Sequence, residues 1–106
     1  MADEGDGFNN NRKYVYLYTG GNAVPKDVTH VRVDKSVTII PYGAFKNCIY
    51  LEEVELPDGI LVIRRMSFSW CTSLTGINIP STVKEIGEHA FYSCGNKMHD
   101  GQSLRL

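Results

Sequence analysis

The chain has 106 residues, 42% of them hydrophobic and 22% charged, and its formal net charge at pH 7 is −1. A chain of this length has room for one hydrophobic core, and the composition is that of an ordinary globular domain. The charge balance excludes the basic surplus that phosphate binding requires, so we expect no nucleic-acid partner. Apolar runs such as GILVI at 59–63 fall far short of the roughly 20 residues that cross a bilayer, so we expect no membrane span.

The first thirteen residues, MADEGDGFNNNRK, are rich in Asn, Gly and acidic side chains. We expect residues 1–13 to be disordered, because they offer little apolar surface to bury. They also lack the apolar stretch of a secretory signal. Three cysteines and the absence of an Asn-x-Ser/Thr sequon agree with a reducing compartment. We therefore expect a cytoplasmic protein.

Residues 14–18, YVYLY, alternate strictly and predict a strand that caps the repeats that follow. In this interpretation Val15 and Leu17 face the core, while Tyr14, Tyr16 and Tyr18 face outward. The next residues, TGGNAVP, provide turn-forming chemistry between this strand and the repeats.

A repeat occupies residues 28–94. Phe45, Phe68 and Phe91 are separated by 68 − 45 = 23 and 91 − 68 = 23 residues, and the three cysteines at 48, 71 and 94 keep the same interval. A fixed period of this size indicates a solenoid, in which each unit buries its apolar face against the next. We expect a solenoid over residues 14–94, with a parallel strand ladder and about 23 residues per repeat.

Each unit contains a short alternating segment, LEEVEL at 51–56 and LTGINI at 74–79, which predicts a strand that ends at a proline. A turn and a second extended piece follow, in DGILVI and STVKEI. The segment from Ala44 to Cys48 and its copies are predicted to form single helical turns that direct Phe and Cys inward. The expected fold class is therefore mainly β with short helical turns.

The composite pattern I-x-x-x-A-F-x-x-C-x-x-L-x-x-V-x-L-P-x-x-V-x-x-I resembles the BspA-type leucine-rich repeat, over about two thirds of the chain. The resemblance implies a binding or adhesion module without catalytic residues in the repeat. The chain departs from the usual pattern at Arg64, where Gly87 carries the expected Gly, at Met66 and Ser67, and at Asp34, where a proline is usual.

After Cys94 the pattern requires apolar residues at 97 and 100, but the chain has Lys97 and Asp100. We expect residues 95–106 to be an irregular tail. Three arrangements stay open: the tail folds back over the last repeat, the chain is a shortened relative of longer proteins, or the uncapped C-terminal rung pairs with another copy.

The cysteines at 48, 71 and 94 share one repeat position between an inward Phe and an inward Leu, which predicts a buried ladder rather than reactive thiols. His89, Cys94 and His99 do not have the spacing of a zinc site. No phosphate loop or hydrolase motif is present either. We therefore expect no metal, no cofactor and no catalytic residue.

The strand faces are the best candidates for a function. If Val31 and Val33 face inward, His30 and Arg32 face outward, and the period places Glu53 beside His30 and Glu55 beside Arg32. Trp70 replaces the polar residues found at its equivalent positions, and Trp is enriched at binding hot spots. The candidate protein-binding residues are His30, Arg32, Glu53, Glu55, Asn78 and Trp70.

The sequence therefore predicts a non-catalytic protein–protein interaction module with an unidentified protein partner. Two alternatives stay open. The chain could be a fragment of a larger cell-surface adhesion protein, or a gene remnant without an independent role. It could also be a thiol-based redox protein, which would require an exposed, acidic cysteine.

Overall fold

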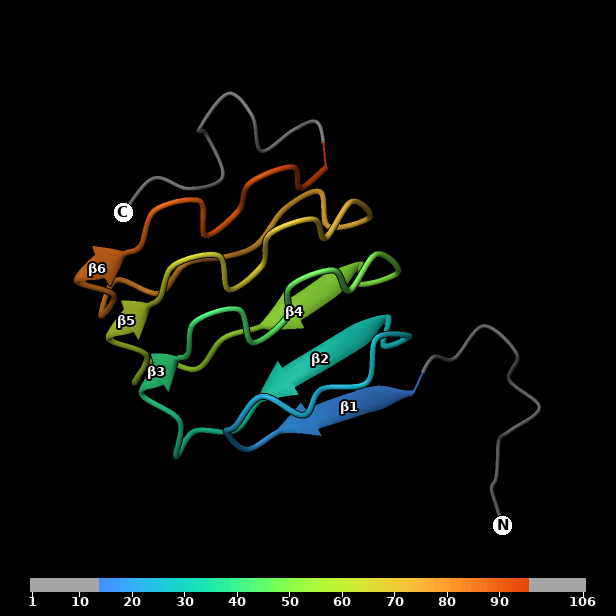
Figure 1. Ribbon diagram of the computed structural model, residues 1–106. Coiled ribbons are helices and arrows are strands. Elements are labelled where there is room, and N and C mark those ends of the chain that lie inside the picture. Colours follow the sequence, from blue (N-terminus) through green and yellow to red (C-terminus); the bar gives the residue numbers. More distant parts are fainter. Residues whose placement is uncertain (1–13, 96–106) are drawn as a thin grey trace, which may run out of the picture.

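The computed structural model of the protein describes residues 14–95. The chain in this range forms six short strands: β1 (Val15–Tyr18), β2 (His30–Val33), β3 (Ile39–Ile40), β4 (Glu53–Glu55), β5 (Val62–Ile63) and β6 (Glu85–Ile86). They make two parallel sheets, with strand orders β1-β2-β4 and β3-β5-β6 (Figure 1). The predicted disordered segment 1–13, and residues 96–106 of the predicted irregular tail, lie outside the described residues.

The strand register confirms the predicted parallel ladder and its period. His30 lies opposite Glu53, and Ile39 lies opposite Val62, so each pair is 23 residues apart (53 − 30 and 62 − 39). The next pair in the second sheet, Val62 with Glu85, keeps the same interval (85 − 62). Successive repeats therefore lie side by side and bring equivalent residues together.

The predicted strand at 14–18 exists, but its predicted orientation is wrong. Val15 and Leu17 are 48% and 51% exposed, whereas Tyr18 is 1% exposed. Tyr16 is half-buried against the core. The cause is the register with β2, which places Tyr16 opposite Val31 and Tyr18 opposite Val33, both inward. Because strand side chains alternate, Val15 and Leu17 must then point outward.

The predicted helical turns are not confirmed, because no helix is present in residues 14–95. The segments 42–47, 65–70 and 88–93 are runs of turns instead. In the first, the N–H groups of Ala44 and Lys46 bond three residues back, whereas those of Gly43, Phe45 and Asn47 bond to carbonyls of the next repeat. A helix needs consecutive N–H groups to bond within the segment, so this alternation prevents one.

The strand expected within residues 74–79 is also not found. Its inward residues, Leu74 and Ile77, are buried as the pattern requires, so the chain follows the path of a repeat without strand pairing. Gly76 stands at the position of Glu53 in the preceding repeat, and glycine weakens a strand interior. The first sheet therefore ends at β4.

A row of aromatic rings runs through the core. The rings of Phe45 and Phe68 lie 5.0 Å apart with a 2° angle between their planes, and those of Phe68 and Phe91 lie 5.3 Å apart at 1°. Tyr18 continues the row at its N-terminal end, 5.0 Å from Phe45 at 57°. Its hydroxyl donates a hydrogen bond to the carbonyl of Gly21 at 2.6 Å, which satisfies the polar end of a buried side chain.

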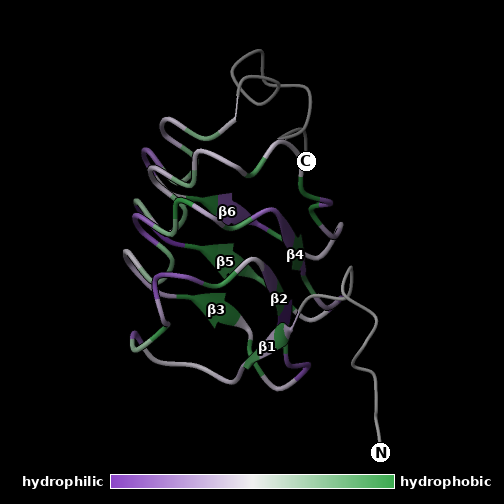
Figure 2. Ribbon diagram, turned by 90° about the vertical axis from the view of Figure 1, so that its right-hand side faces the viewer, coloured by the Kyte–Doolittle hydropathy of each residue, from purple (hydrophilic) through white to green (hydrophobic). Residues whose placement is uncertain are grey.

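Hydropathy differs among the strands. In Figure 2 the strands β3 and β5 are coloured as hydrophobic, whereas β2 carries the hydrophilic residues His30 and Arg32 in alternation with its inward valines. Among residues 14–95 there is no helix long and apolar enough to cross a membrane.

Candidate binding surface

The outer face of the sheet β1-β2-β4 carries four polar side chains in two rows, a histidine, an arginine and two glutamates. His30 Nε2 lies 3.2 Å from Glu53 Oε1, and Arg32 Nε donates to Glu55 Oε1 at 2.9 Å. The repeat period predicts both pairs, and the structure confirms them. We call these four residues the charged rows.

The charged rows are ordered without being deeply buried. The side chains of Arg32 and Glu55 are 57% and 61% exposed, and Glu53 is similarly open. Exposed ion pairs of this kind contribute about 0–1 kcal/mol to stability. Their main physical effect is therefore to fix where donors and acceptors lie on the surface.

A shallow groove of about 330 Å³ adjoins the charged rows at the carboxyl ends of the strands. Leu17, Leu56 and Pro57 give it apolar walls, and Arg32 and Glu55 lie on its rim. Its remaining lining residues are Val33, Asp34 and Lys35.

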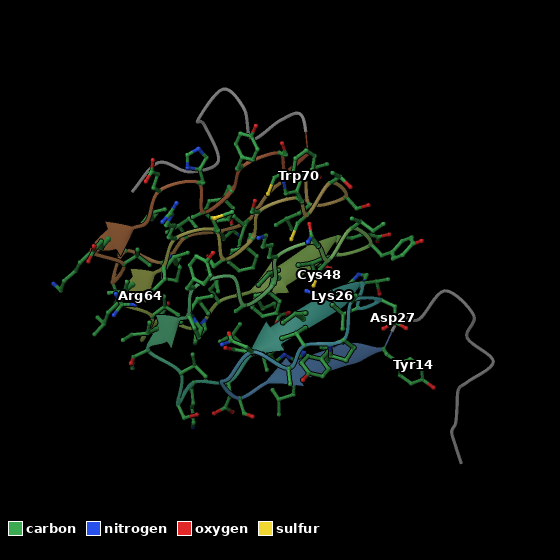
Figure 3. The ribbon with its side chains drawn as sticks, viewed as in Figure 1. Tyr14, Lys26, Asp27, Cys48, Arg64 and Trp70 are labelled. Carbon is green, nitrogen blue, oxygen red and sulfur yellow. The ribbon has the colours of Figure 1, made fainter. Side chains whose placement is uncertain are left out.

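The other two candidates are placed differently. Asn78 is exposed but lies outside any strand. Trp70 belongs to the turn segment 65–70, whose neighbours are the turn segments of the adjoining repeats rather than the first sheet. Figure 3 shows Trp70 projecting from this part of the molecule. The structure thus brings together the four residues of the charged rows, but not Trp70.

Trp70 combines exposure with an unusual backbone. It is 45% exposed and its φ is 65°, in the left-handed region that bulky residues rarely adopt. Its ring packs edge-on against Tyr92, with centroids 5.8 Å apart, and Tyr92 also contacts the ring of His89 at 5.1 Å. The result is a small exposed aromatic cluster on the turn side of the molecule.

The three cysteines form the predicted buried ladder. All three are free and buried. Cys71 Sγ donates to the carbonyl of Phe45 and Cys94 Sγ to that of Phe68, each at 3.1 Å. Burial raises the pKa of the Cys94 thiol to about 11, and it raises the pKa of Cys71 and Cys48 as well. A nucleophilic thiol needs the opposite shift, so the geometry does not support thiol chemistry.

Metal-ligating residues do not gather in the part of the chain that the structure describes, where no group of three or more His, Cys, Asp or Glu side chains could hold an ion. His89 and Cys94 lie in this part, and His99 lies outside it.

The repeat geometry agrees with a comparison against protein families. A family model described as "BspA type Leucine rich repeat region (6 copies)" matches residues 25–99. The chain belongs to the BspA-type leucine-rich repeat family. A search of curated proteins and a search of solved structures each gave no match.

The structure explains one departure from the BspA-type pattern. Asp34 stands where Pro57 and Pro80 stand in the later repeats, yet all three make the same turn. The carbonyls of Asp34, Pro57 and Pro80 accept from the N–H groups of Val37, Ile60 and Val83 at 3.0, 3.2 and 3.1 Å. Asp34 also accepts a hydrogen bond from the N–H of Ser36 at 3.0 Å. Asp is a common turn former for this reason.

The Ser36 hydroxyl bonds the same carboxylate, and the hydrogen bonds from the Ser36 side chain and backbone lower the pKa of Asp34. The carboxylate that replaces the BspA-type proline is thus held in its ionised form by the turn that it stabilises.

A second departure concerns backbone conformation. Gly43, Met66 and His89 occupy one position of the BspA-type repeat, and their φ angles are 64°, 57° and 60°. Only glycine adopts this conformation without steric cost, so the two later repeats carry a strained residue where the first does not.

Sequence reasoning missed the outward position of Val15 and Leu17, and with it the apolar wall that Leu17 gives the groove. The turn that follows each strand is the signal that could have revealed it. Tyr18 directly precedes TGG, just as Leu56 precedes PDG. If β1 is aligned with the later strands by the turn that follows each, Tyr18 corresponds to the inward residue Leu56. This alignment works even though β1 and β2 are separated by fewer residues than one repeat.

Proposed function

We propose that residues 14–94 act as one short solenoid that binds a partner protein through the charged rows and the adjoining groove, without catalysing a reaction. Two considerations support this function. Proteins of the BspA-type repeat family are generally non-catalytic modules. The charged rows also combine fixed polar groups with a neighbouring apolar surface.

The observation that carries the proposal is the pairing of His30 with Glu53 and of Arg32 with Glu55 across adjacent strands. Side chains already held in one arrangement lose little further freedom when a partner binds. Fixed charges of both signs favour a partner with the complementary pattern and disfavour others. The apolar walls of the groove, Leu17, Leu56 and Pro57, supply surface that a partner can bury.

Charge reversal at Glu55 tests the proposal. Glu55→Arg places two arginines side by side in one row, so we expect the partner captured by the wild-type chain to be lost. The matched control is Glu85→Arg, which makes the same change on an exposed position of the other sheet. The readout is quantitative affinity capture, followed by titration of the captured partner against both variants.

Trp70→Ala distinguishes binding through the aromatic cluster from binding through the charged rows. Equal binding by the wild type and Glu55→Arg, with loss in Trp70→Ala, would move the site to the aromatic cluster. Equal loss in Glu55→Arg and Glu85→Arg would show a general charge effect and contradict the proposal.

A further inference from the structure

β1 is the edge strand of the first sheet, since it pairs with β2 on one side and with no other strand among the described residues. Natural proteins usually protect such an edge with Lys, Pro, a bulge or a covering segment. The four residues of β1, VYLY, contain neither charge nor proline, and their outer side chains, Val15 and Leu17, are about half exposed.

The backbone of β1 offers hydrogen bonds at this edge. Tyr18 directs its carbonyl toward β2, where it accepts from Asp34 N at 2.9 Å. Peptide groups in a strand alternate between its two sides. The N–H and C=O groups of Val15 and Leu17 therefore point away from β2, toward the open edge.

The edge is complementary to itself. In an antiparallel pair of two β1 strands centred on Tyr16, the sequence positions of opposing residues add to 32. Val15 then faces Leu17 of the other copy, and their open N–H and C=O groups bond to each other. Both members of each outer pair are aliphatic, and Tyr16 faces Tyr16 on the inner side. No like charges meet in this register, which is the usual obstacle to pairing a strand with itself.

We propose that β1 pairs with β1 of a second copy of this chain, antiparallel and centred on Tyr16. The two first sheets then form one continuous sheet across a twofold axis, with an isologous interface. This inference does not depend on the proposed function. It also places self-association at the N-terminal rung rather than at the uncapped C-terminal rung that the sequence suggested.

A groove beside β1 can accommodate the inward-facing tyrosine side chains of a second copy. It has a volume of about 490 Å³ and lies between β1 and the segment 25–29, with Tyr14 and Tyr16 on one wall and Pro25 and Val28 on the other. Tyr14 is 94% exposed, and Figure 3 shows it at this end of the molecule near Asp27. Pairing through β1 would bring the second copy's Tyr16 to this groove and bury aromatic surface on both chains.

Sedimentation of the full chain over a range of concentrations tests the proposal. A pair of four-residue strands makes a small interface, so we expect a reversible dimer whose population rises with concentration. Leu17→Glu puts a carboxylate in each apolar outer pair and should weaken the dimer roughly tenfold or more. Leu61→Glu is the matched control, because Leu61 is also an exposed leucine but lies away from β1, where its carbonyl accepts from the N–H of Lys84 at 2.8 Å. It should leave the dimer unchanged.

The substitution Tyr16→Cys tests the register. Opposing residues that are not hydrogen-bonded to each other in an antiparallel pair have Cα atoms about 4.5 Å apart, within the disulfide range of about 4.4–6.8 Å. Tyr16→Cys should therefore form a covalent dimer under mild oxidation, while Leu61→Cys should not. Circular dichroism of each variant confirms that the chain is folded.

Three results would overturn the proposal. The first is a wild-type chain that stays monomeric at high concentration, whether residues 1–13 cover β1 or leave it open. The second is a dimer equally resistant to Leu17→Glu and Leu61→Glu, which would place the interface elsewhere. The third is a folded Tyr16→Cys chain that dimerises without forming the disulfide, which would exclude this register.

Discussion

Ser67 is fully buried, and its hydroxyl has no hydrogen-bond partner within residues 14–95. The equivalent positions in the neighbouring repeats carry Ala44 and Ala90, which have no polar group to satisfy. A buried polar group without a partner costs about 1–3 kcal/mol. At the scale of single residues, the second repeat therefore carries a destabilising buried hydroxyl that the neighbouring repeats lack.

Ser67→Ala should increase the free energy of unfolding by about 1 kcal/mol, since the hydroxyl loses hydration on folding and gains no bond. Urea denaturation followed by circular dichroism measures the change. Ala90→Ser is the reciprocal control and should destabilise the protein. A decrease in stability for Ser67→Ala would mean that the hydroxyl is satisfied in solution.

The stacked thiols predict a dependence of stability on alkaline pH. Burial raises the pKa of Cys94 from its ordinary value of 9.0 to about 11, so the native state holds this proton more tightly than the unfolded state does. Its contribution to the free energy of unfolding is complete below about pH 9 and is lost as the pH rises through about 11. Denaturation across this window should show a steeper fall for the wild type than for Cys94→Ala. Equal slopes would contradict the predicted shift.

At the scale of elements, the turn segments 42–47, 65–70 and 88–93 are defined by two left-handed positions in each repeat. One is occupied by Gly43, Met66 and His89, and the other by Asn47, Trp70 and Ser93. The alternation of bonds within and between repeats requires this backbone whatever side chain is present. Trp70 is the bulkiest residue to accept it, with a φ of 65°.

Gly43→Ala should lower the free energy of unfolding by about 1 kcal/mol, because a residue with a Cβ pays roughly 1–2 kcal/mol for a left-handed backbone. Steric contact does not contribute, since a Cβ at Gly43 would meet no atom within 4 Å. Gly76→Ala is the matched control, because it has the same free space without a positive φ. It should be neutral or stabilising when measured by the same denaturation experiment. Equal effects would show that the turn does not need its left-handed residue.

At the scale of the whole molecule, the repeats are joined through their cores. Phe68 is fully buried between Phe45 and Phe91, with parallel rings on both sides. Each repeat in such an array is stabilised mainly by its neighbours. The middle ring therefore links the two halves of the described structure.

Phe68→Ala should remove about 3–5 kcal/mol of stability, a large share of the roughly 5–15 kcal/mol typical of a domain. We expect the cooperative thermal transition to disappear in scanning calorimetry. Tyr50→Ala, which truncates an exposed aromatic residue, is the control and should leave the transition in place. A sharp transition retained near the wild-type temperature in Phe68→Ala would contradict the stacked core.

The sequence by itself determined three features that repeat at an interval of 23: the parallel register, the inward Phe and Cys ladders, and the pairing of Arg32 with Glu55. Equivalent residues of stacked repeats must lie side by side, so arithmetic on the sequence is enough to place them. The sequence did not determine where the 23-residue period fails. β1 pairs with β2 at an offset of 30 − 15 = 15 residues, so the period does not give its phase.

Only the tertiary structure decided that Tyr18 caps the aromatic row and that Val15 and Leu17 face outward. It also decided that the segments 42–47, 65–70 and 88–93 are turns. The first two donate N–H groups to carbonyls of the next repeat, far along the chain, and the third accepts such bonds through the carbonyls of Glu88, Ala90 and Tyr92. Local propensity carries no information about such partners. The exposed edge of β1 follows from the same cause, because a strand becomes an edge only through the arrangement of the strands around it.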